Sequence, residues 1–198
     1  FYCLNPDVWH PKIEVPEEYL LSALPEGTVR LYHAVGHREE RTRNDGVNIK
    51  SSHVYLPLID KMRREGVALD LVEPEGIPNK EVRFLQVQAD IFLDMLTYGW
   101  FGANAREAMM LGKPVVCFLR PEWLRSAREE IPDYVKELPI ISATPETVEA
   151  VLRDLIANKE KRLEIGRKGR EFAKKWHSDE AGAKRFDRIY CELMGRVQ

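Results

Sequence analysis

The fold is decided by the stretch Thr97-Tyr-Gly-Trp-Phe-Gly-Ala-Asn-Ala-Arg-Glu-Ala-Met-Met-Leu-Gly-Lys-Pro-Val-Val-Cys-Phe-Leu119. It predicts a glycine-bearing loop, a short helix that begins after Gly102, a tight turn and a buried strand. Gly112 is expected to end the helix, because glycine tolerates the left-handed backbone conformation needed there. The apolar run over residues 115–119 is typical of a strand covered on both faces of a parallel sheet.

The start of this helix has the chemistry of an anion site. Its small residues Ala103, Ala105 and Ala108 let the backbone approach a ligand closely. Open backbone N–H groups and the helix dipole, about half a unit charge, favour a phosphate there. Glu107 lies one turn further on, and its carboxylate can accept two hydrogen bonds from a sugar diol. A solvated helix carboxylate is the ordinary alternative.

The composition indicates one ordinary soluble domain. The 198 residues are 44% hydrophobic and 31% charged, and 30 basic against 32 acidic residues give a formal charge of −2. Without a basic excess, neither nucleic-acid binding nor bulk membrane attraction is indicated. No apolar stretch reaches about 18 residues, so no transmembrane helix is predicted. Cys3, Cys117 and Cys191 lack metal-ligand spacing, and their odd number favours a reducing compartment.

The first part of the chain is rich in proline. Its prolines favour extended structure and turns, with at most one short helix over Glu17–Leu24. Residues 1–28 are therefore predicted to be a linker that leads into the domain. The first residue is Phe and no signal peptide is visible, so the sequence is expected to be a fragment of a longer protein.

Strands alternate with helices along the rest of the chain. The predicted strands are Val29–Val35, Val67–Val72, Asp90–Asp94, Val115–Leu119 and Pro139–Ile141. The predicted helices are one capped by Ser51 or Ser52 that ends at Gly66, Asn79–Gln88, the helix after Gly102, Pro121–Glu130, one that starts at Thr144-Pro145, Lys159–Trp176 and Ser178–Met194. This alternation predicts an α/β fold, a Rossmann-like parallel sheet flanked by helices.

Two helices carry local features of their own. Pro57 requires the first long helix to start late or to bend. Ser126 and Glu129 are spaced as a capping box.

A long polar loop, Gly36–Lys50, leaves the first strand. It carries four basic residues, Arg38, Arg41, Arg43 and Lys50, interleaved with Glu39, Glu40 and Asp45. A solvated mixed-charge loop is the alternative to a phosphate site. In parallel sheets the ligand lies at the carboxyl ends of the strands, where the strand order switches. This loop and the glycine loop after the third strand are therefore expected to face one crevice. His33, at the end of the first strand, is expected to be a buried histidine without a chemical role.

Four motifs in sequence order resemble a known family. They are Asn5-Pro-Asp-Val-x-His-Pro11, then His33-Ala-Val-Gly36 with Asn48-Ile-Lys50-Ser-Ser, then Asp94-x4-Gly99-Trp-Phe-Gly-x4-Glu107-Ala-Met-x2-Gly112-Lys-Pro-Val115, then Trp176-His177-Ser178 with Ala181 and Tyr190. Together they resemble the C-terminal, donor-binding half of retaining glycosyltransferases with the two-domain GT-B fold. The branch is the large bacterial one that makes polysaccharides and lipopolysaccharides (glycosyl transferases group 1). The resemblance covers nearly the whole chain.

The resemblance implies how a nucleotide-sugar donor would be held. Lys50 and an arginine of the first loop would meet the pyrophosphate and neutralise the leaving group. Arg43 is preferred over Arg38 and Arg41, which compete because the loop is longer here than in the family. The predicted donor-binding residues are Gly36, Arg41, Gly102, Ala103, Asn104 and Glu107. Glu107 would hold the ribose hydroxyls. No metal and no cofactor besides the donor are expected, and the sequence has no Asp-x-Asp motif.

One position departs from the family. Two glutamates separated by seven residues are usual, and the first touches the transferred sugar. Here Gly99 stands at the first position and Glu107 at the second. Recognition of the sugar is therefore open, or is shifted to backbone N–H groups of residues 100–102.

The predicted function is the donor half of a glycosyltransferase that acts on a glycan or lipid-linked acceptor. Residues 29–176 would form the nucleotide-sugar-binding domain, and residues 177–198 a helix that crosses back toward a missing N-terminal domain, through which the acceptor would bind. The expected location is the cytoplasm, with peripheral membrane association of the full-length enzyme left open. The alternatives are a nucleotide-binding module without transfer activity and a nucleotide-sugar epimerase of the same fold.

Overall fold

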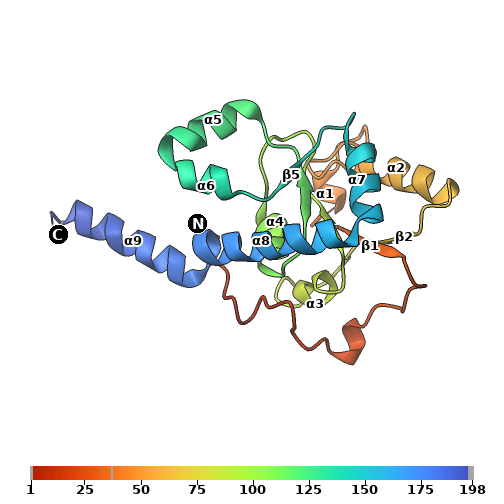
Figure 1. The fold of residues 1–198 in the computed structure, drawn as a ribbon, viewed down its shortest axis with the longest axis horizontal. Helices are drawn as coiled ribbons and strands as arrows, with labels where there is room; N and C mark the ends of the chain where they lie inside the picture. Colours follow the sequence, from red (N-terminus) through yellow and green to blue (C-terminus); the bar gives the residue numbers. More distant parts are fainter. Residues whose placement is uncertain (1, 37, 196–198) are drawn as a thin grey trace.

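Five parallel strands form one sheet in the order β2-β1-β3-β4-β5 (Figure 1). We describe a computed structural model that covers residues 2–36 and 38–195. The strands are β1 (Val29–His33), β2 (Leu69–Val72), β3 (Ile91–Leu93), β4 (Val115–Cys117) and β5 (Ile141–Ser142). Leu31 pairs with Leu71 on one side and with Ile91 on the other. The predicted Rossmann-like α/β fold is confirmed. β1 to β4 are shorter than predicted, and β5 shares only Ile141 with the predicted strand Pro139–Ile141.

Helices cover both faces of the sheet (Figure 1). They are α1 (Arg38–Arg41), α2 (Ser52–Arg64), α3 (Val82–Gln86), α4 (Ala103–Met110), α5 (Pro121–Glu130), α6 (Pro132–Glu137), α7 (Val148–Ala157), α8 (Lys159–His177) and α9 (Asp179–Leu193), with a short 3-10 helix η1 (Glu17–Tyr19). The alternation of side chains along β3 sorts the core into two layers. Ile91 and Leu93 pack with α2 and α7, whereas Phe92 packs with α4 and α8.

Three local predictions differ from the structure. Ser126 lies inside α5, whose N-cap is Arg120, so the predicted capping box is wrong. Pro121 takes the first helical position instead, where its missing N–H costs nothing. α6 follows α5 directly and was not predicted, although Pro132 also stands at a helix start. α7 begins at Val148, with Thr147 as its N-cap, and not at Thr144-Pro145 as predicted. α2 runs from Ser52 through Pro57 to Arg64, so of the two alternatives predicted at Pro57 the late start does not occur.

The turn at Gly112 is as predicted. Gly112 has φ 71° and directly follows the C-cap of α4. The same end of α4 is crossed by α8 at very close range. A Cβ at Gly166 would lie 2.0 Å from the Gly112 carbonyl oxygen, so only glycine allows this crossing. α8 thus fixes the position of α4, whose other end lies at the carboxyl edge of the sheet.

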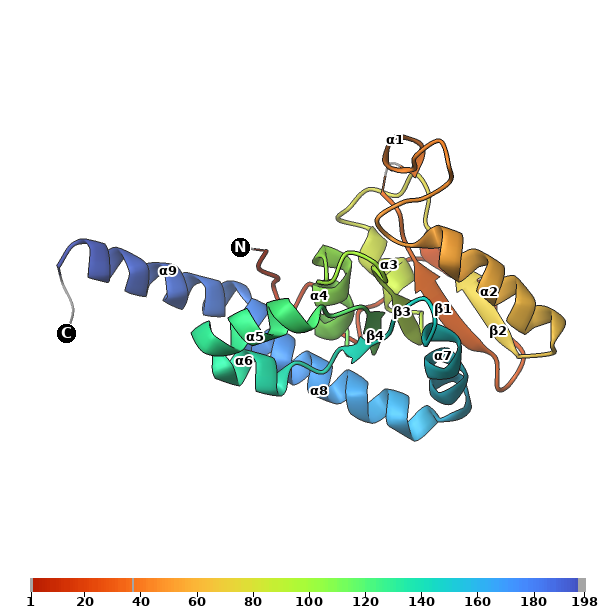
Figure 2. The same ribbon diagram turned by 90° about the horizontal axis from the view of Figure 1, so that it is seen from above.

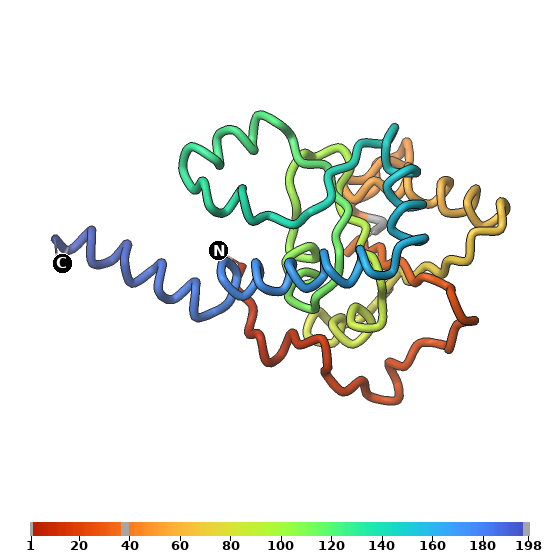
Figure 3. Tube along the Cα trace, viewed as in Figure 1, coloured from red at the N-terminus to blue at the C-terminus, as the bar shows by residue number. Residues whose placement is uncertain are grey.

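The N-terminal segment packs on the body of the domain. Leu4 forms a parallel bridge with Ser178, and its N–H donates to the carbonyl of His177 at 2.8 Å. Trp9 is buried, and the Arg170 guanidinium donates to its carbonyl at 3.0 Å. Figure 3 shows the segment starting beside the junction of α8 and α9 and then winding past α3. The role of residues 1–28 as a linker from another domain stays a prediction.

α9 projects from the body, as does α1 at the opposite corner (Figure 2). The Ser178 Oγ accepts the Ala181 N–H at 3.1 Å and so caps the start of α9. Phe186, Tyr190 and Leu193 expose large apolar surfaces on this helix. Among the helices that the structure describes, none combines the length and the apolar character needed to cross a membrane.

Candidate functional site

The two loops singled out by the sequence leave neighbouring strands. β1 leads into residues 34–51 and β3 into residues 94–102, and β1 pairs with β3. The chain goes from β1 to β2 on one side and then returns to β3 on the other. The strand order therefore switches between β1 and β3, where parallel α/β sheets bind ligands. The expectation that both loops face one crevice fits this topology.

Asp94 joins the two loops. The Lys50 ammonium forms an ion pair with Asp94 Oδ1, and the Gly102 N–H donates to Asp94 Oδ2 at 3.0 Å. The Asp94 side chain is 2% exposed and that of Lys50 is 13% exposed. A Cβ at Gly102 would lie 3.2 Å from Lys50 Nζ, so glycine there makes room for the ammonium. A lysine is thus held at the start of α4.

Ser51 couples the same loops through the backbone. It is fully buried and has φ 62°, a left-handed conformation that non-glycine residues rarely adopt. Its Oγ accepts the Leu96 N–H at 3.0 Å. Strained backbone of this kind costs about 1–3 kcal/mol and persists where the surroundings hold it, often at functional sites. The predicted cap at Ser51 is in place, but its side chain bonds Leu96 rather than α2.

The arginines of the first loop are spread out. Arg41 ends α1, and its Nη1 lies 3.7 Å from where a Cβ on Gly36 would stand. Arg43 is highly exposed and forms a 3.0 Å ion pair with Asp45. That geometry fits the solvated-loop alternative for Arg43. The Arg38 side chain lies outside the described part of the chain. The structure thus brings Arg41, not Arg43, next to Gly36.

The start of α4 retains open donors. Gly102 is its N-cap, and α4 has no side-chain cap. Ala103 and Asn104 are half-buried in its first turn. Asp94 bonds only the N–H of Gly102 itself, so the first-turn N–H groups remain available to an anion. The Lys50 ammonium beside them adds a positive charge.

The Glu107 side chain is buried and hydrogen-bonded within the chain rather than open to solvent. It is 1% exposed, and its Oε2 accepts a hydrogen bond from Gln86 Nε2 at 2.8 Å. Its Oε1 accepts a short hydrogen bond from the Tyr2 hydroxyl of the N-terminal segment. Burial and the Glu107 carboxylate raise the pKa of Tyr2, so its hydroxyl stays protonated and donates. A ligand that uses Glu107 must therefore displace Tyr2.

Polar atoms without partners lie near Glu107. Within the described residues, the Tyr32 hydroxyl and Gln86 Oε1 are buried and make no hydrogen bond of good geometry, although the Gln86 side chain is near enough to the Tyr32 hydroxyl to lower its pKa slightly. Burial raises the pKa of Tyr32, and so does the charge of Glu107. Such orphaned groups are rare in folded proteins and mark a place for water or a ligand. The surroundings of Glu107 therefore have unused hydrogen-bonding capacity.

Gly99 is required by its own geometry. Its φ is 98°, and a Cβ there would lie 2.8 Å from Arg120 Cβ and 3.0 Å from Arg120 Nε. The space that a side chain at position 99 would need is taken by Arg120. No carboxylate can therefore stand at position 99 in this loop conformation.

The histidines behave as structural residues. His33 is fully buried, as expected, and its Nε2 lies 2.7 Å from the Ser52 Oγ. His177 packs among aromatic rings, and its Nε2 lies 3.0 Å from the Tyr134 hydroxyl. Over residues 2–36 and 38–195 no group of three or more His, Cys, Asp or Glu side chains could hold a metal ion. Cys117 is a buried core thiol, as expected, and burial raises its pKa.

Four residues of this region were given no role in the sequence analysis: Asp94, Gln86, Tyr2 and Arg120. Asp94 could have been found, because it stands at the carboxyl end of a predicted strand. Tyr2 could not, because it meets Glu107 across 105 positions of sequence.

Comparison with known proteins supports the fold. No family model matches the chain, and the comparison with curated proteins gave no match. Its structure is similar to a sucrose-phosphate synthase from Thermosynechococcus elongatus, with TM-score 0.60 and 17% identity. It is also similar to a glycosyltransferase from Rickettsia africae, with TM-score 0.65 and 12% identity. Each comparison covers 99% of this chain, but only 52% and 57% of those proteins.

At such identity the likeness establishes the fold alone. The chain spans little more than half the length of either structure. The bacterial polysaccharide branch therefore stays a prediction from the sequence motifs.

Proposed function

We propose that this chain is the donor-binding half of a glycosyltransferase and that it holds a nucleotide-sugar at the carboxyl edge of its sheet. The observation that carries the proposal is the placement of Lys50 at the uncapped start of α4, at the switch in strand order. Comparison supports the proposal, since the two similar structures are those of a sucrose-phosphate synthase and a glycosyltransferase.

The chemistry follows from charge. As the bond between sugar and diphosphate breaks, negative charge grows on the leaving diphosphate. In this proposal the uncapped first turn of α4 and the Lys50 ammonium, which Asp94 holds in place, would stabilise that charge with little reorganisation. Charge-assisted hydrogen bonds of this kind contribute about 1.5–3 kcal/mol each. Arg41 is the loop arginine that we assign to the phosphates, since Arg43 is paired with Asp45.

Asp94 has a positioning role in this proposal. Its two oxygens hold the Lys50 ammonium and the Gly102 N–H, so the cation and the helix start keep one geometry. An ammonium carries three N–H donors, so one bond to Asp94 leaves others for a phosphate.

Binding of ribose by Glu107 requires an exchange. The Tyr2 hydroxyl occupies Glu107 Oε1 as a sugar hydroxyl would. We propose that the ribose diol replaces Tyr2 on this carboxylate, while Gln86 stays on the other oxygen. The acceptor, and any residue that activates it, would belong to a second domain outside this chain.

One observation favours a different reading of Glu107, in which this carboxylate is only structural. Both oxygens of Glu107 are engaged within the chain. Buried carboxylates with two internal donors commonly have no ligand.

Two substitutions separate these readings by calorimetry with uridine and guanosine diphosphates. Glu107→Gln keeps the shape but loses the charge, so it should weaken binding about tenfold or more. Tyr2→Phe removes the competing hydroxyl, so it should strengthen binding about threefold. Both variants should unfold at a slightly lower temperature than the wild type. The melting temperature is the control, because it reports the structural effect of each substitution separately from binding. If neither variant changes the affinity while both lower the melting temperature, Glu107 is a structural carboxylate.

A further inference from the structure

Arg120 lies at the same edge of the sheet as the proposed diphosphate site. It follows β4 and is the N-cap of α5. Its backbone N–H donates to the Gly99 carbonyl at 2.8 Å, so it is fastened to the loop that leads to α4. Gly99 precedes Gly102 by three residues, which span at most about 11 Å. The side chain of Arg120 therefore starts beside the loop that leads to the α4 N-terminus.

The guanidinium of Arg120 is held in place but is not neutralised. Its Nη2 donates to the Tyr98 carbonyl at 3.2 Å, and its Cζ lies 5.0 Å from the centre of a Trp123 ring. No carboxylate of the described residues forms an ion pair with it. Arginine has five N–H donors, so most of them remain open to a ligand. This contrasts with Lys50, whose charge is shared with Asp94.

The loop backbone leaves no room for a side chain at position 99, where the positively charged side chain of Arg120 lies instead. Gly99 adopts a left-handed φ of 98°, and the nearest obstacle to a side chain there is Arg120 Cβ, 2.8 Å from the ideal Cβ position. A Cβ atom cannot swing aside as a side-chain tip can. A hydroxyl-reading carboxylate at position 99 is therefore excluded sterically, and a guanidinium stands in its place.

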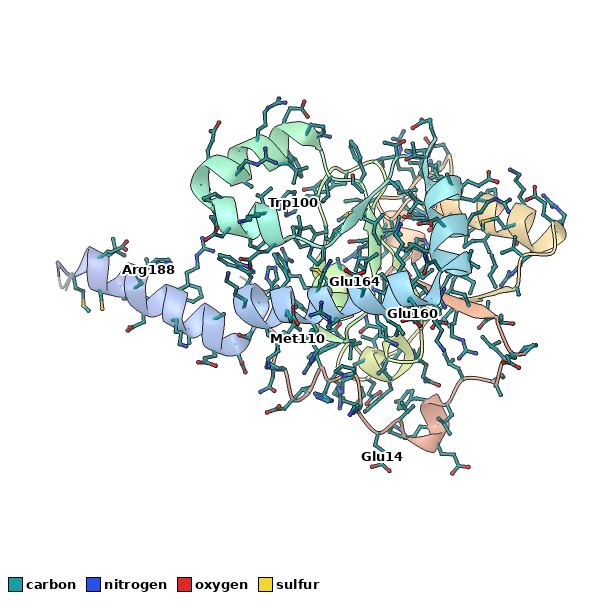
Figure 4. All side chains as sticks on the ribbon, in the orientation of Figure 1. Glu14, Trp100, Met110, Glu160, Glu164 and Arg188 are labelled. Carbon is teal, nitrogen blue, oxygen red and sulfur yellow. The ribbon has the colours of Figure 1, made fainter. Side chains whose placement is uncertain are left out.

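The Trp123 ring lies against this cation, and two more aromatic rings pack on Trp123. Tyr98 is 47% exposed, and its ring meets Trp123 at 5.4 Å between centroids. Trp100 meets Trp123 at 6.3 Å. Figure 4 shows Trp100 between the sheet and the hairpin formed by α5 and α6. Aromatic faces give a sugar ring apolar contact area, while a planar guanidinium binds a carboxylate through two parallel hydrogen bonds.

We propose that Arg120 recognises an acidic group on the donor sugar, the carboxylate of a hexuronic acid. Tyr98 and Trp123 would contact the ring of that sugar, and Arg120 would pair with its carboxylate. This assignment rests on the proposed diphosphate site at α4, and it names the substrate class that the sequence motifs left open. A lysine would serve less well, because only the guanidinium fork matches both carboxylate oxygens.

The test compares donors that differ only in the carboxylate. Uridine diphosphate, UDP-glucose and UDP-glucuronate are titrated by calorimetry. Guanosine diphosphate, GDP-mannose and GDP-mannuronate are titrated in the same way. The variant is Arg120→Gln, which keeps a polar side chain but removes the charge. The matched control is Arg125→Gln, at an exposed arginine of the same helix that pairs with Glu122.

The wild type should bind the nucleotide-sugar that carries a uronate about fivefold more tightly than the matching neutral nucleotide-sugar. Arg120→Gln should abolish that difference and leave the affinity for the bare diphosphate unchanged, whereas Arg125→Gln should keep the difference. Equal affinity of the wild type for both nucleotide-sugars, or a preference that survives Arg120→Gln, overturns the role of Arg120 and leaves the proposed function intact. Failure to bind either bare diphosphate overturns the proposed function, and this inference falls with it.

Discussion

At the scale of single residues, the Lys50–Asp94 pair contributes to the stability of the fold and also belongs to the proposed diphosphate site. The pair is largely buried, and charges removed from water need good geometry and further hydrogen bonds to be tolerated. Asp94 obtains these from the Gly102 N–H at 3.0 Å. Breaking such a pair by removing one partner costs about 3–5 kcal/mol, whereas replacing both partners is far milder. Any functional test of Lys50 must therefore change Asp94 as well.

His177 predicts a pH dependence of stability. Burial lowers its pKa from 6.5 to about 3, and the charge of Arg106 acts in the same direction. The unfolded chain therefore binds a proton that the folded chain does not, between pH 6.5 and about 3. The stabilisation is complete above pH 6.5 and is lost as the pH falls through this range.

Urea unfolding of the wild type and of His177→Gln measures this effect. Glutamine can accept the Tyr134 hydroxyl bond but does not titrate. Between about pH 7.5 and about pH 5, the wild type should lose up to about 2 kcal/mol more than the variant. Parallel pH profiles of the two proteins would show that the imidazole is not held neutral in the fold.

At the scale of elements, the packing of α8 on α4 depends on one glycine. Gly166→Ala would place a methyl group 2.0 Å from the Gly112 carbonyl oxygen, which is backbone and cannot move away cheaply. We expect the free energy of unfolding to fall by about 3 kcal/mol, the upper end for overpacking. Chemical denaturation measures the change.

Gly169→Ala is the control in the same helix. Its methyl group would lie 3.5 Å from the nearest Met109 atoms, an ordinary contact. Alanine favours helix by up to about 1 kcal/mol over glycine, so stability should stay equal or rise. Equal losses from both alanines would mean that the close crossing at Gly112 does not exist.

The elements show what local sequence can predict. Apolar runs and flanking glycines were enough to place the five strands and to end α4 at Gly112, because these features act over a few residues. The capping box at Ser126 was wrong, since Pro121 had already started that helix. α6 was missed because Ile131-Pro132 was not treated as a second helix start.

The candidate site was predictable in part, for the same physical reason. Lys50 and the start of α4 follow from strand ends and a glycine turn, so the topology brings them together. The contacts of Glu107 with Tyr2, and of Gly99 with Arg120, join distant parts of the chain. No local pattern encodes them. The contact with Tyr2 determines whether the Glu107 carboxylate is accessible. The contact of Gly99 with Arg120 determines which charge would face the proposed donor sugar.

At the scale of the whole molecule, both ends of the chain bear on the site. The N-terminal segment runs from Tyr2 on Glu107 to the bridge between Leu4 and Ser178. That bridge also fixes the start of α9, which then leaves the body with an exposed apolar stripe; Figure 4 marks Arg188 on this helix. Both similar structures are nearly twice as long as this chain. The proposal places the acceptor in a second domain. That this second domain packs on the exposed apolar side of α9 stays a prediction.

The central claim is that a nucleotide diphosphate binds where Lys50 meets the start of α4. Calorimetric titration of the wild type with uridine and guanosine diphosphates tests it most directly, beside the double variant Lys50→Gln with Asp94→Asn, which removes both charges of the pair at once. The wild type should bind at least one diphosphate, and the folded double variant should bind it about tenfold more weakly or worse. Absence of binding by the wild type, or equal affinity of the folded double variant, would contradict the claim.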